Sequence, residues 1–321
     1  MGGGNALAAG RDVRAKPRRA LCLINPNARQ GQGEVAARIR GTLASEGMEL
    51  VECDTGSPKA SGDFLRRHAD GADAIVIGGG DGTISEQLPL LLELRKPLGV
   101  LPLGTANDLA RSLGLPLDPV EAAAAVAAGR RRAIDVGLID GRTPFLNVAS
   151  MGLTSMLSRR LKGETKRRLG RLGYWLEGVK AFHERKPFRV TITAADGRTW
   201  RRKALQLAVG NGRSYGGMLV IDEEAEIWDG LLHLYSVEPR PFLYLLRQAP
   251  GFFLGRLRHR DGILALEGPM FAVETEKPIE ISADGEIKGT TPARFEVVRH
   301  ALEVFIPEDA SDYAGAGAGA R

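Results

Sequence analysis

The first third of the chain alternates short apolar runs with stretches of helical pattern, and this order limits the folds that the chain can adopt. Four apolar runs have the length of strands, at residues 21–24, 50–53, 74–77 and 98–101. A helical stretch follows each run, at residues 34–45, 58–69, 84–94 and 107–113. Strands separated by helices in this way predict a parallel sheet with helices on both faces. Ligands of such sheets bind beyond the carboxyl ends of the strands, so the loops there are the first candidates for a site.

The loop after the third apolar run is rich in glycine. Residues 78–83 read Gly-Gly-Gly-Asp-Gly-Thr and lead directly into the helical stretch 84–94. Because glycine has no side chain, a ligand can approach the backbone closely, and free N–H groups can point at an anion. The N-terminal dipole of the following helix would face the same ligand. With Asp81 and Thr83 in the loop, the sequence favours a site for phosphate together with a metal ion.

The pattern changes near residue 135. A helical stretch at 154–182 is followed by strand-like runs that are separated by Asp-Gly turns. These runs lie at residues 188–193, 204–209, 231–237, 279–282 and 295–305. We therefore expect a second domain that is mostly β and antiparallel.

Composition and charge narrow the class of protein. The formal net charge of +5 favours an anionic partner, such as a nucleotide, a nucleic acid or an acidic membrane surface. A solvated basic surface explains this charge equally well. No apolar run approaches the roughly 18 residues that a transmembrane helix needs, and residues 1–19 lack the apolar core of a secretory signal. Cys22 and Cys53 fall in apolar segments and are expected to be reduced, which indicates a cytoplasmic protein.

The glycine loop has companions elsewhere in the chain, and together they resemble a known family. Three of the matching segments are Asn25-Pro26, Gly104-Thr105-Ala106-Asn107-Asp108 and Asp284-Gly285-Glu286. The others are Gly210-Asn211-Gly212, Gly216-Gly217 and Asp229-Gly230-Leu231. In this order, over roughly residues 18–307, the chain resembles the diacylglycerol kinase catalytic-domain family, which includes bacterial soluble lipid kinases and sphingosine kinases. NAD kinases carry a similar glycine loop, so the combination of motifs is more specific than the loop alone.

This resemblance implies an α/β ATP-binding domain, a β-sandwich lipid-binding domain and ATP in the cleft between them. The expected fold class is therefore α/β, with an N-terminal doubly wound parallel-sheet domain and a C-terminal antiparallel β-sandwich domain. The expected domains are residues 18–134 and 135–307, with residues 300–309 as a candidate to pack back on the first. Residues 1–17 and the Ala/Gly-rich residues 308–321 are expected to be flexible tails.

The resemblance also implies which residues hold ATP. The glycine loop and Thr83 would bind the phosphates, and the loop around residue 105 would complete the pocket. The full set of expected ATP contacts is Asn25, Thr55, Gly79, Gly80, Asp81, Gly82, Thr83, Gly104, Thr105, Asn107 and Asp108. The Asn-Asp pair can also cap a helix while it contacts ribose, phosphate or metal.

Two acidic residues in the second half are the expected catalytic pair. Asp284 and Glu286 are two residues apart, so on an extended strand both would face the same side. One can accept the proton of the lipid hydroxyl while the other orients it or helps to hold Mg²⁺. We expect Glu286 to be the proton acceptor, with Asp284 essential beside it. Asp81, on the phosphate loop itself, is the rival base.

A further pair of acids resembles a structural Mg²⁺ site of the bacterial family members. Glu226, Asp229 and the carbonyl of Leu231 combine two carboxylates with a backbone oxygen, which suits a hard cation. Glu stands at the first position, where Asp is common in the family. In isolation, Asp229-Gly230 and Asp284-Gly285 would be interpreted as hairpin turns, and only the accompanying motifs favour a functional role.

One basic segment bears on partners. Lys and Arg make up more than half of residues 159–171, and Tyr174 and Trp175 follow. Such a segment favours docking on an anionic membrane surface, with a solvated helix face as the alternative. The apolar stretch 242–257 either lines a lipid entrance or packs in the core. Nucleic-acid binding is not expected because no recognised module is present, and a homodimer is left open.

The sequence thus predicts an ATP- and Mg²⁺-dependent lipid kinase, cytoplasmic and peripherally associated with membranes. It would transfer the γ-phosphoryl group of ATP to a lipid hydroxyl, most simply converting diacylglycerol to phosphatidic acid. A sphingoid-base or phosphatidylglycerol kinase is the first alternative. An NAD kinase comes next, followed by a non-catalytic nucleotide or lipid sensor.

Overall fold

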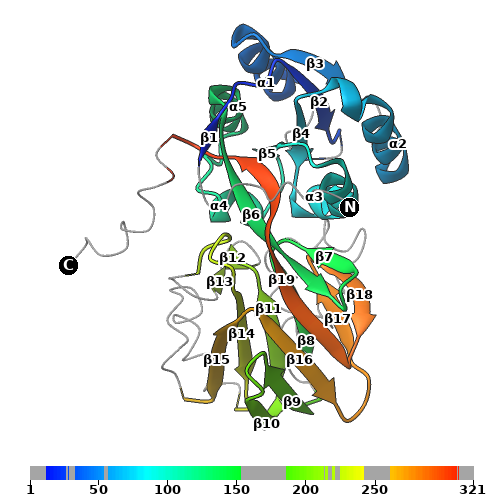
Figure 1. Cartoon of the computed structure of the whole chain (residues 1–321), viewed down its shortest axis with the longest axis vertical. Coiled ribbons are helices and arrows are strands. Elements are labelled where there is room, and N and C mark those ends of the chain that lie inside the picture. Colours follow the sequence, from blue (N-terminus) through cyan, green and yellow to red (C-terminus); the bar gives the residue numbers. More distant parts are fainter. Residues whose placement is uncertain are drawn as a thin grey trace, which may run out of the picture. The chain divides into compact units, whose positions relative to one another are not determined.

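The fold is described from a computed structural model of the chain (Figure 1). It describes residues 12–26, 28, 33–53, 57–152, 186–212, 214–215, 219–220, 225–241, 261–308 and 310. The expected helix 154–182, the basic segment 159–171 with Tyr174 and Trp175, and the apolar stretch 242–257 lie outside the described residues. Gly216-Gly217 and most of both expected tails also lie outside them. The chain divides into two compact units: the first holds residues 1–136, 226–229 and 298–321, and the second holds 137–225 and 230–297.

The first unit contains a parallel sheet, as the sequence predicts. Its strands run in the order β3-β2-β4-β5, and each neighbouring pair is parallel. These strands are β2 (Arg19–Ile24), β3 (Glu49–Glu52), β4 (Ala74–Gly79) and β5 (Leu98–Pro102). The end of β19 (Ala293–Phe305) continues the sheet, because Val304 pairs in parallel with Leu98 of β5.

Helices cover both faces of this sheet. α1 (Glu34–Ser45) and α5 (Pro119–Ala128) pack on one face, and α2 (Pro58–His68) and α3 (Asp81–Leu94) pack on the other. A 3₁₀ turn, Ala69–Gly71, follows α2, and the short α4 (Asp108–Ser112) follows β5. This arrangement is the doubly wound fold that the alternation of strands and helices predicts.

The sequence did not lead us to expect α5, yet its ends carry ordinary helix signals. Asp118 precedes the helix, and its carboxylate accepts hydrogen bonds from the N–H groups of Val120 (2.8 Å) and Glu121 (3.1 Å). Gly129 follows the helix with a φ of 78°, the left-handed conformation that ends many helices. Val126 of α5 packs with Ile39 of α1 and Val76 of β4 in one buried cluster.

Both ends of the described chain are tied to the first unit. β1 (Val13–Arg14) pairs antiparallel with the start of β6 (Arg130–Ile139). Arg130 is buried, its Nη2 lies 2.6 Å from Asp12 Oδ2, and its Nη1 donates to the carbonyl of Pro307 at 2.9 Å. One buried guanidinium therefore holds segments from both ends.

The second unit is built from antiparallel strands. One sheet has the order β15-β14-β11-β8-β17-β18. Its strands are β8 (Val148–Gly152), β11 (Gln206–Gly210), β14 (Leu232–Val237), β15 (Ile263–Gly268), β17 (Glu280–Ala283) and β18 (Glu286–Thr290). The neighbouring pairs are all antiparallel.

A second layer faces this sheet. It has the order β10-β9-β16-β19, made by β9 (Phe188–Ala194), β10 (Thr199–Ala204), β16 (Met270–Thr275) and the first part of β19. β7 (Thr143–Phe145) pairs with the end of β6, and β12 (Ser214–Tyr215) pairs with β13 (Leu219–Val220). Side chains from both layers, including Leu207, Ile281, Ile192 and Phe271, form one buried core. The unit is thus the antiparallel sandwich that the family resemblance implies.

Candidate active site

The strand order of the first unit creates a natural ligand position. From β2 the chain passes through α1 to β3, and from β4 it passes through α3 to β5 on the far side. The connections that leave the neighbouring strands β2 and β4 therefore run in opposite directions, over opposite faces of the sheet. Open α/β sheets bind ligands in the crevice at such a switch point. The loops that begin at Asn25 and Gly80 lie there.

The glycine loop is shorter than the sequence predicts. We expected the helix to begin at residue 84, but α3 begins at Asp81, so Asp81, Gly82 and Thr83 form its first turn. The N–H groups of Thr83 and Ile84 both point at the carbonyl of Gly80. The N–H groups of Asp81 and Gly82 have no acceptor among the described residues. Two backbone donors at the positive end of a helix are therefore available to an anion.

Most glycines of the loops after β4 and β5 are required by the packing of those loops. A Cβ on Gly79 would lie 2.7 Å from Thr83 Cβ, and a Cβ on Gly104 would lie 2.5 Å from Gly80 Cα. The loops after β4 and β5 therefore touch backbone to backbone. Gly82 differs, because a Cβ there would meet nothing within 4 Å and the residue is exposed. Packing among the described residues does not explain this glycine.

Two side chains join the loop after β2 to the glycine loop. Asn25 Nδ2 donates a hydrogen bond to Thr83 Oγ1 at 3.0 Å, and the Asn25 N–H donates to the carbonyl of Gly78 at 2.8 Å. The structure thus brings two expected ATP contacts together. Thr55, another expected contact, lies outside the described residues.

The loop after β5 closes on itself through Asn107. The Asn107 amide accepts from the Gly104 N–H at 2.9 Å and donates to the Gly104 carbonyl at 3.2 Å. Asn107 has a φ of 52° and stands just before α4, but its side chain does not cap that helix. Asp81, the first residue of α3, caps α4 instead, because its Oδ1 accepts a hydrogen bond from the N–H of Leu109 at 3.0 Å. Asp81, the rival base, therefore has a structural task that links α3 to α4.

The surface around these loops is open. Gly82 and Thr105 are exposed, whereas Asp108 is buried. The hollow behind the loop has no room even for a water molecule, whereas ligand pockets begin at roughly 300 Å³. A nucleotide would therefore lie over the exposed side of the loop. Two larger hollows among the described residues lie in the second unit.

Asp284 occupies a tight turn in the second unit. It and Gly285 join β17 to β18, with φ values of 48° and 88°. Positive φ at both positions is typical of a two-residue hairpin turn. The expectation that Asp284 and Glu286 share one face of a strand is therefore wrong, because Asp284 belongs to the turn and Glu286 begins the next strand.

Backbone N–H groups surround the Asp284 carboxylate. Oδ2 accepts from Leu146 at 2.8 Å, and Oδ1 accepts from Asn147 at 2.9 Å and Val148 at 3.2 Å. Burial raises the pKa of the Asp284 carboxyl, and the three N–H donors together with the Lys288 ammonium offset only part of that rise. Asp284 thus anchors the hairpin to the segment that begins β8.

Glu286 has a different environment. Its side chain is exposed and forms no hydrogen bond or ion pair with any residue that the structure describes. Its carboxylate is therefore available, while that of Asp284 is largely occupied. Asp284 and Glu286, which the sequence analysis predicts to act as a pair, therefore have different environments.

Asn211 supports the same anchor, in a role that the sequence did not reveal. Its Nδ2 donates to the carbonyl of Leu146 at 3.0 Å, and its N–H donates to the carbonyl of Asn147 at 2.8 Å. Asn211 therefore holds the segment whose N–H groups surround Asp284. The motif Gly210-Asn211-Gly212 was a signal for this residue, but its contacts depend on the pairing of β11 with β8.

The expected Mg²⁺ ligands already take part in local bonds. Trp228 Nε1 donates to Glu226 Oε2 at 2.6 Å, and the Glu226 N–H donates to Asp229 Oδ2 at 3.1 Å. The guanidinium of Arg132 lies 4.0 Å from the centre of the Trp228 ring. No group of three or more His, Cys, Asp or Glu side chains that could hold a metal occurs within the described ranges. Glu226, Asp229 and Leu231 thus remain a predicted site.

A glycine loop at the switch point of a doubly wound sheet is typical of α/β proteins that bind anionic ligands at the carboxyl ends of their strands. Comparison with known families is more specific. Residues 19–139 match the diacylglycerol kinase catalytic domain, and residues 147–306 match the YegS C-terminal NAD kinase beta sandwich-like domain.

Relatives agree with these two matches. The chain is 35% identical over 245 residues to a Pseudomonas aeruginosa protein named "Probable lipid kinase YegS-like", covering 74% of this chain and 78% of that one. It is 28% identical over 302 residues to a diacylglycerol kinase of Bacillus subtilis, covering 92% and 98%. A crystal structure of a diacylglycerol kinase from Bacillus anthracis superposes with a TM-score of 0.75 at 28% identity, covering 92% and 99%.

The chain therefore belongs to the diacylglycerol kinase-like family of lipid kinases, a class of ATP-dependent phosphotransferases. Among the described residues, no helix is long and apolar enough to cross a membrane.

Proposed function

We propose that this enzyme transfers the γ-phosphoryl group of ATP to the hydroxyl of diacylglycerol and so forms phosphatidic acid. The observation that carries the proposal is the glycine loop at the switch point, where the N–H groups of Asp81 and Gly82 are available to a phosphate. The names of the relatives from Bacillus support diacylglycerol as the acceptor.

In this proposal the first unit holds the nucleotide. The phosphates lie over Gly82 and Thr83, on the open side of the loop, and Asn25 fixes the Thr83 hydroxyl. Gly79, Gly80 and Gly104 let the loops pack closely, and Asn107 holds the second loop in shape. Thr105, Asp108 and Thr55 complete the proposed set of ATP contacts. Positioning and charge stabilisation by such donors supply most of the rate in phosphoryl transfer.

We assign proton transfer to Glu286 rather than to Asp284 or Asp81. The Glu286 carboxylate is exposed and has no partner within the described residues, whereas the Asp284 carboxylate accepts three backbone hydrogen bonds. Asp81 caps α4. The lipid hydroxyl would give its proton to Glu286 as its oxygen bonds to the γ-phosphorus. The bond from that phosphorus to the β–γ bridging oxygen breaks, and ADP leaves with the electron pair.

Mg²⁺ is part of the proposal as the partner of the ATP phosphates, where it would neutralise charge that develops during transfer. Glu226, Asp229 and Leu231 remain the proposed ligands of a structural ion, since two carboxylates and a carbonyl are ligands that Mg²⁺ accepts. Thermal unfolding of wild type and Glu226→Gln with and without Mg²⁺ tests this site. A Mg²⁺-dependent rise in melting temperature that the variant retains would contradict it.

A labelled-phosphate assay tests the reaction. Purified enzyme is given ATP labelled at the γ-phosphate and a panel of acceptors in mixed micelles: diacylglycerol, phosphatidylglycerol, a sphingoid base and NAD. We expect label in phosphatidic acid, and Glu286→Gln should lower kcat by about 10²- to 10⁴-fold, as for loss of a general base. Label in another lipid or in NAD would replace the proposed acceptor. If the protein binds ATP but labels none of these acceptors, the alternative of a non-catalytic nucleotide or lipid sensor would be favoured.

A further inference from the structure

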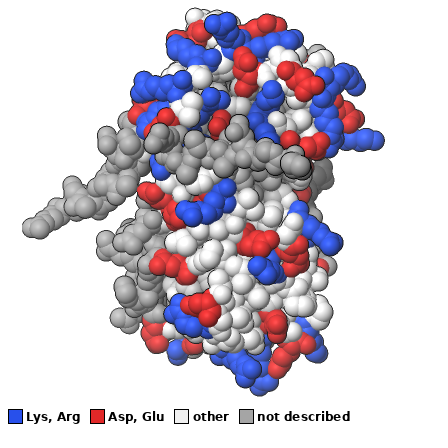
Figure 2. Space-filling model, viewed as in Figure 1, with Lys and Arg blue, Asp and Glu red and all other residues white. Residues whose placement is uncertain are grey.

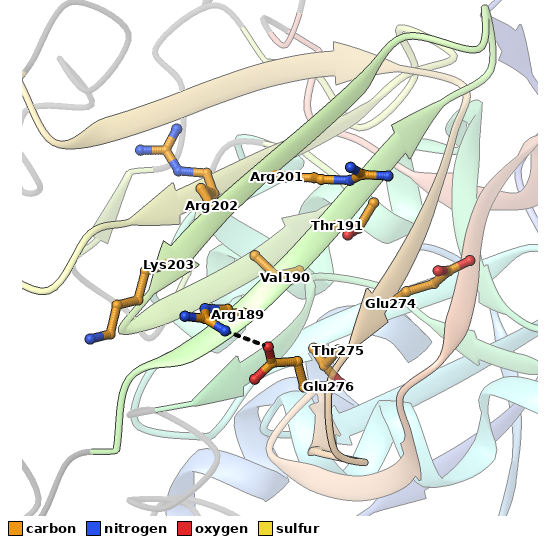
Figure 3. A pocket seen from close by; sticks show the side chains of 9 residues that line it. All are labelled: Arg189, Val190, Thr191, Arg201, Arg202, Lys203, Glu274, Thr275 and Glu276. Carbon is orange, nitrogen blue, oxygen red and sulfur yellow. Dashed lines mark hydrogen bonds and ion pairs between the residues drawn. The ribbon is translucent and has the colours of Figure 1, made fainter.

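The exposed face of β9, β10 and β16 in the second unit carries a shallow hollow of about 560 Å³ (Figure 3). Arg189, Arg201, Lys203, Glu274 and Glu276 supply its charged side chains, together with Arg202. In Figure 2, Lys and Arg side chains gather around the strands that Figure 1 labels β9 and β10, with acidic side chains beside them. We call the surface formed by Arg189, Arg201 and Lys203, with Lys186 and Lys277 beside them, the basic face.

Strand register brings these cations together. Lys203 of β10 lies directly opposite Arg189 of β9, and Arg201 lies opposite Thr191. Because side chains alternate along a strand, Arg201 and Lys203 lie on the same face of the sheet. Like charges directly opposite each other on neighbouring strands are unfavourable. The placement of Lys203 opposite Arg189 therefore does not itself stabilise the fold.

Within the described residues, four of the five cations of the basic face have no ion-pair partner. Arg189 pairs with Glu276 at 2.8 Å, and Arg202 pairs with Glu238 at 2.6 Å. Arg201 and Lys203 form no ion pair with any described residue.

An adjoining hollow of about 540 Å³ shares Arg189 and Lys203 and adds Lys186 and Lys277. Neither of these lysines has an ion pair in the described part of the chain. Phe188 and Ile279 line the same hollow. Across the two hollows, basic side chains outnumber acidic ones two to one.

We propose that the basic face docks the enzyme on the anionic headgroups of a phospholipid bilayer. This inference rests on the proposed function, because a diacylglycerol substrate lies in such a bilayer. The unpaired cations are spread over a sheet face, and in Figure 3 the tips of Arg201 and Lys203 point apart rather than at a common centre. Spread charges of this kind match a planar array of anions, and each attracts the surface independently.

Edge protection is the competing explanation for part of this charge. β10 ends the order of its sheet, and charged side chains on such strands hinder pairing with other molecules. Either sign of charge serves that purpose, whereas only positive charge attracts an anionic membrane. Charge reversal therefore separates the two explanations.

Vesicle binding without ATP tests the proposal on the full-length protein. The probes are sedimented vesicles of phosphatidylcholine alone or with phosphatidylglycerol. One cation near an anionic surface is worth about fivefold in partitioning, from about 1 kcal/mol each. The double variant R201Q/K203Q should therefore bind the anionic vesicles about 30-fold more weakly than wild type. R201E/K203E should bind more weakly still while the protein remains soluble.

A matched control removes two exposed cations from the first unit. Arg38 of α1 and Lys59 of α2 likewise lack ion pairs among the described residues, so R38Q/K59Q has the same net charge as R201Q/K203Q. We expect this control to bind vesicles as wild type does. Equal losses in both double variants, or no loss in R201Q/K203Q, would refute docking by the basic face. Docking would also be refuted if inorganic phosphate at constant ionic strength displaced the protein from the vesicles. It would likewise be refuted if R201Q/K203Q lost binding to labelled nucleic acid but kept its binding to vesicles.

A separate measurement distinguishes this inference from the proposed function. In detergent micelles, where docking on a bilayer is not needed, R201Q/K203Q should phosphorylate diacylglycerol at the wild-type rate. If wild type binds anionic vesicles through the basic face but labels no lipid, the proposed reaction fails and the docking surface stands. If lipid is labelled and vesicle binding is unchanged in the variant, only the docking surface fails.

Discussion

Gly82→Ala should make the protein more stable and weaken its binding of ATP. Gly82 is the second residue of α3, its φ is not in the left-handed region, and a Cβ there would meet nothing within 4 Å. Alanine therefore fits the free protein without strain. A helical residue also prefers alanine to glycine, because glycine loses more backbone freedom on folding.

The two effects have different magnitudes. A compatible Gly→Ala change stabilises by about 0.4–1 kcal/mol, which raises the melting temperature by about 1–4 °C for a domain of this size. The proposed phosphate contact at the Gly82 N–H involves a charged acceptor, and such a hydrogen bond is worth about 1.5–3 kcal/mol. A methyl group that displaces the phosphate should therefore raise the Kd for ATP about 10- to 100-fold.

Two assays on the same preparation check this prediction. Differential scanning calorimetry without nucleotide gives the melting temperature, and isothermal titration calorimetry with a non-hydrolysable ATP analogue gives the Kd. Gly104→Ala serves as the contrast, because its Cβ would lie 2.5 Å from Gly80 Cα. That overpacking should cost about 1–3 kcal/mol of stability. A Gly82→Ala protein that is more stable and binds the analogue as wild type does would refute a phosphate over Gly82.

Three further predictions concern buried charge. Arg130→Met leaves Asp12 and the Pro307 carbonyl without their buried partner. Urea unfolding should therefore show a free energy of unfolding lower by about 2–4 kcal/mol, and an unchanged midpoint would contradict this. Asp284→Asn should unfold at a lower urea concentration than wild type, because its amide NH₂ would face the backbone N–H groups of residues 146–148. Glu286→Gln should instead keep the wild-type urea midpoint and lose activity. Since burial raises the pKa of Asp284 above its ordinary 3.8, ionisation of this group disfavours folding. The stability of wild type relative to Asp284→Asn should therefore be greatest below pH 3.8 and fall as pH rises through the folded pKa, as measured by urea unfolding of both proteins across pH.

The parallel sheet was predictable because its strands are continuous apolar runs between helical stretches. Buried strands of this kind carry their own signal, as Ala74 to Ile77 do. Some strands with one solvated face were missed. β10 reads Thr-Trp-Arg-Arg-Lys-Ala, and its place in the sheet depends on pairing with β9. β18 depends in the same way on the turn at Asp284.

The site shows the same division between local and distant information. The glycine loop follows β4 directly, so its position at a strand end could be predicted from sequence. The separate environments of Asp284 and Glu286 could not, because the N–H groups that occupy Asp284 belong to residues 146–148. The task of Asp81 at α4 is hidden for the same reason, since its partner Leu109 lies 28 residues away.

The division into two units has a practical consequence for dissecting the protein. Neither unit is one continuous piece of chain, because the boundaries fall inside β6 and β19 and residues 226–229 belong with the first unit. A fragment that ends at residue 136 would lack Val304, which pairs with β5, and Phe305, which is buried in the core of the first unit. Such a truncation would expose a strand edge and leave a gap in the core. An isolated first unit would therefore have to be made by joining the C-terminal strand to the N-terminal segment, as in a circularly permuted protein.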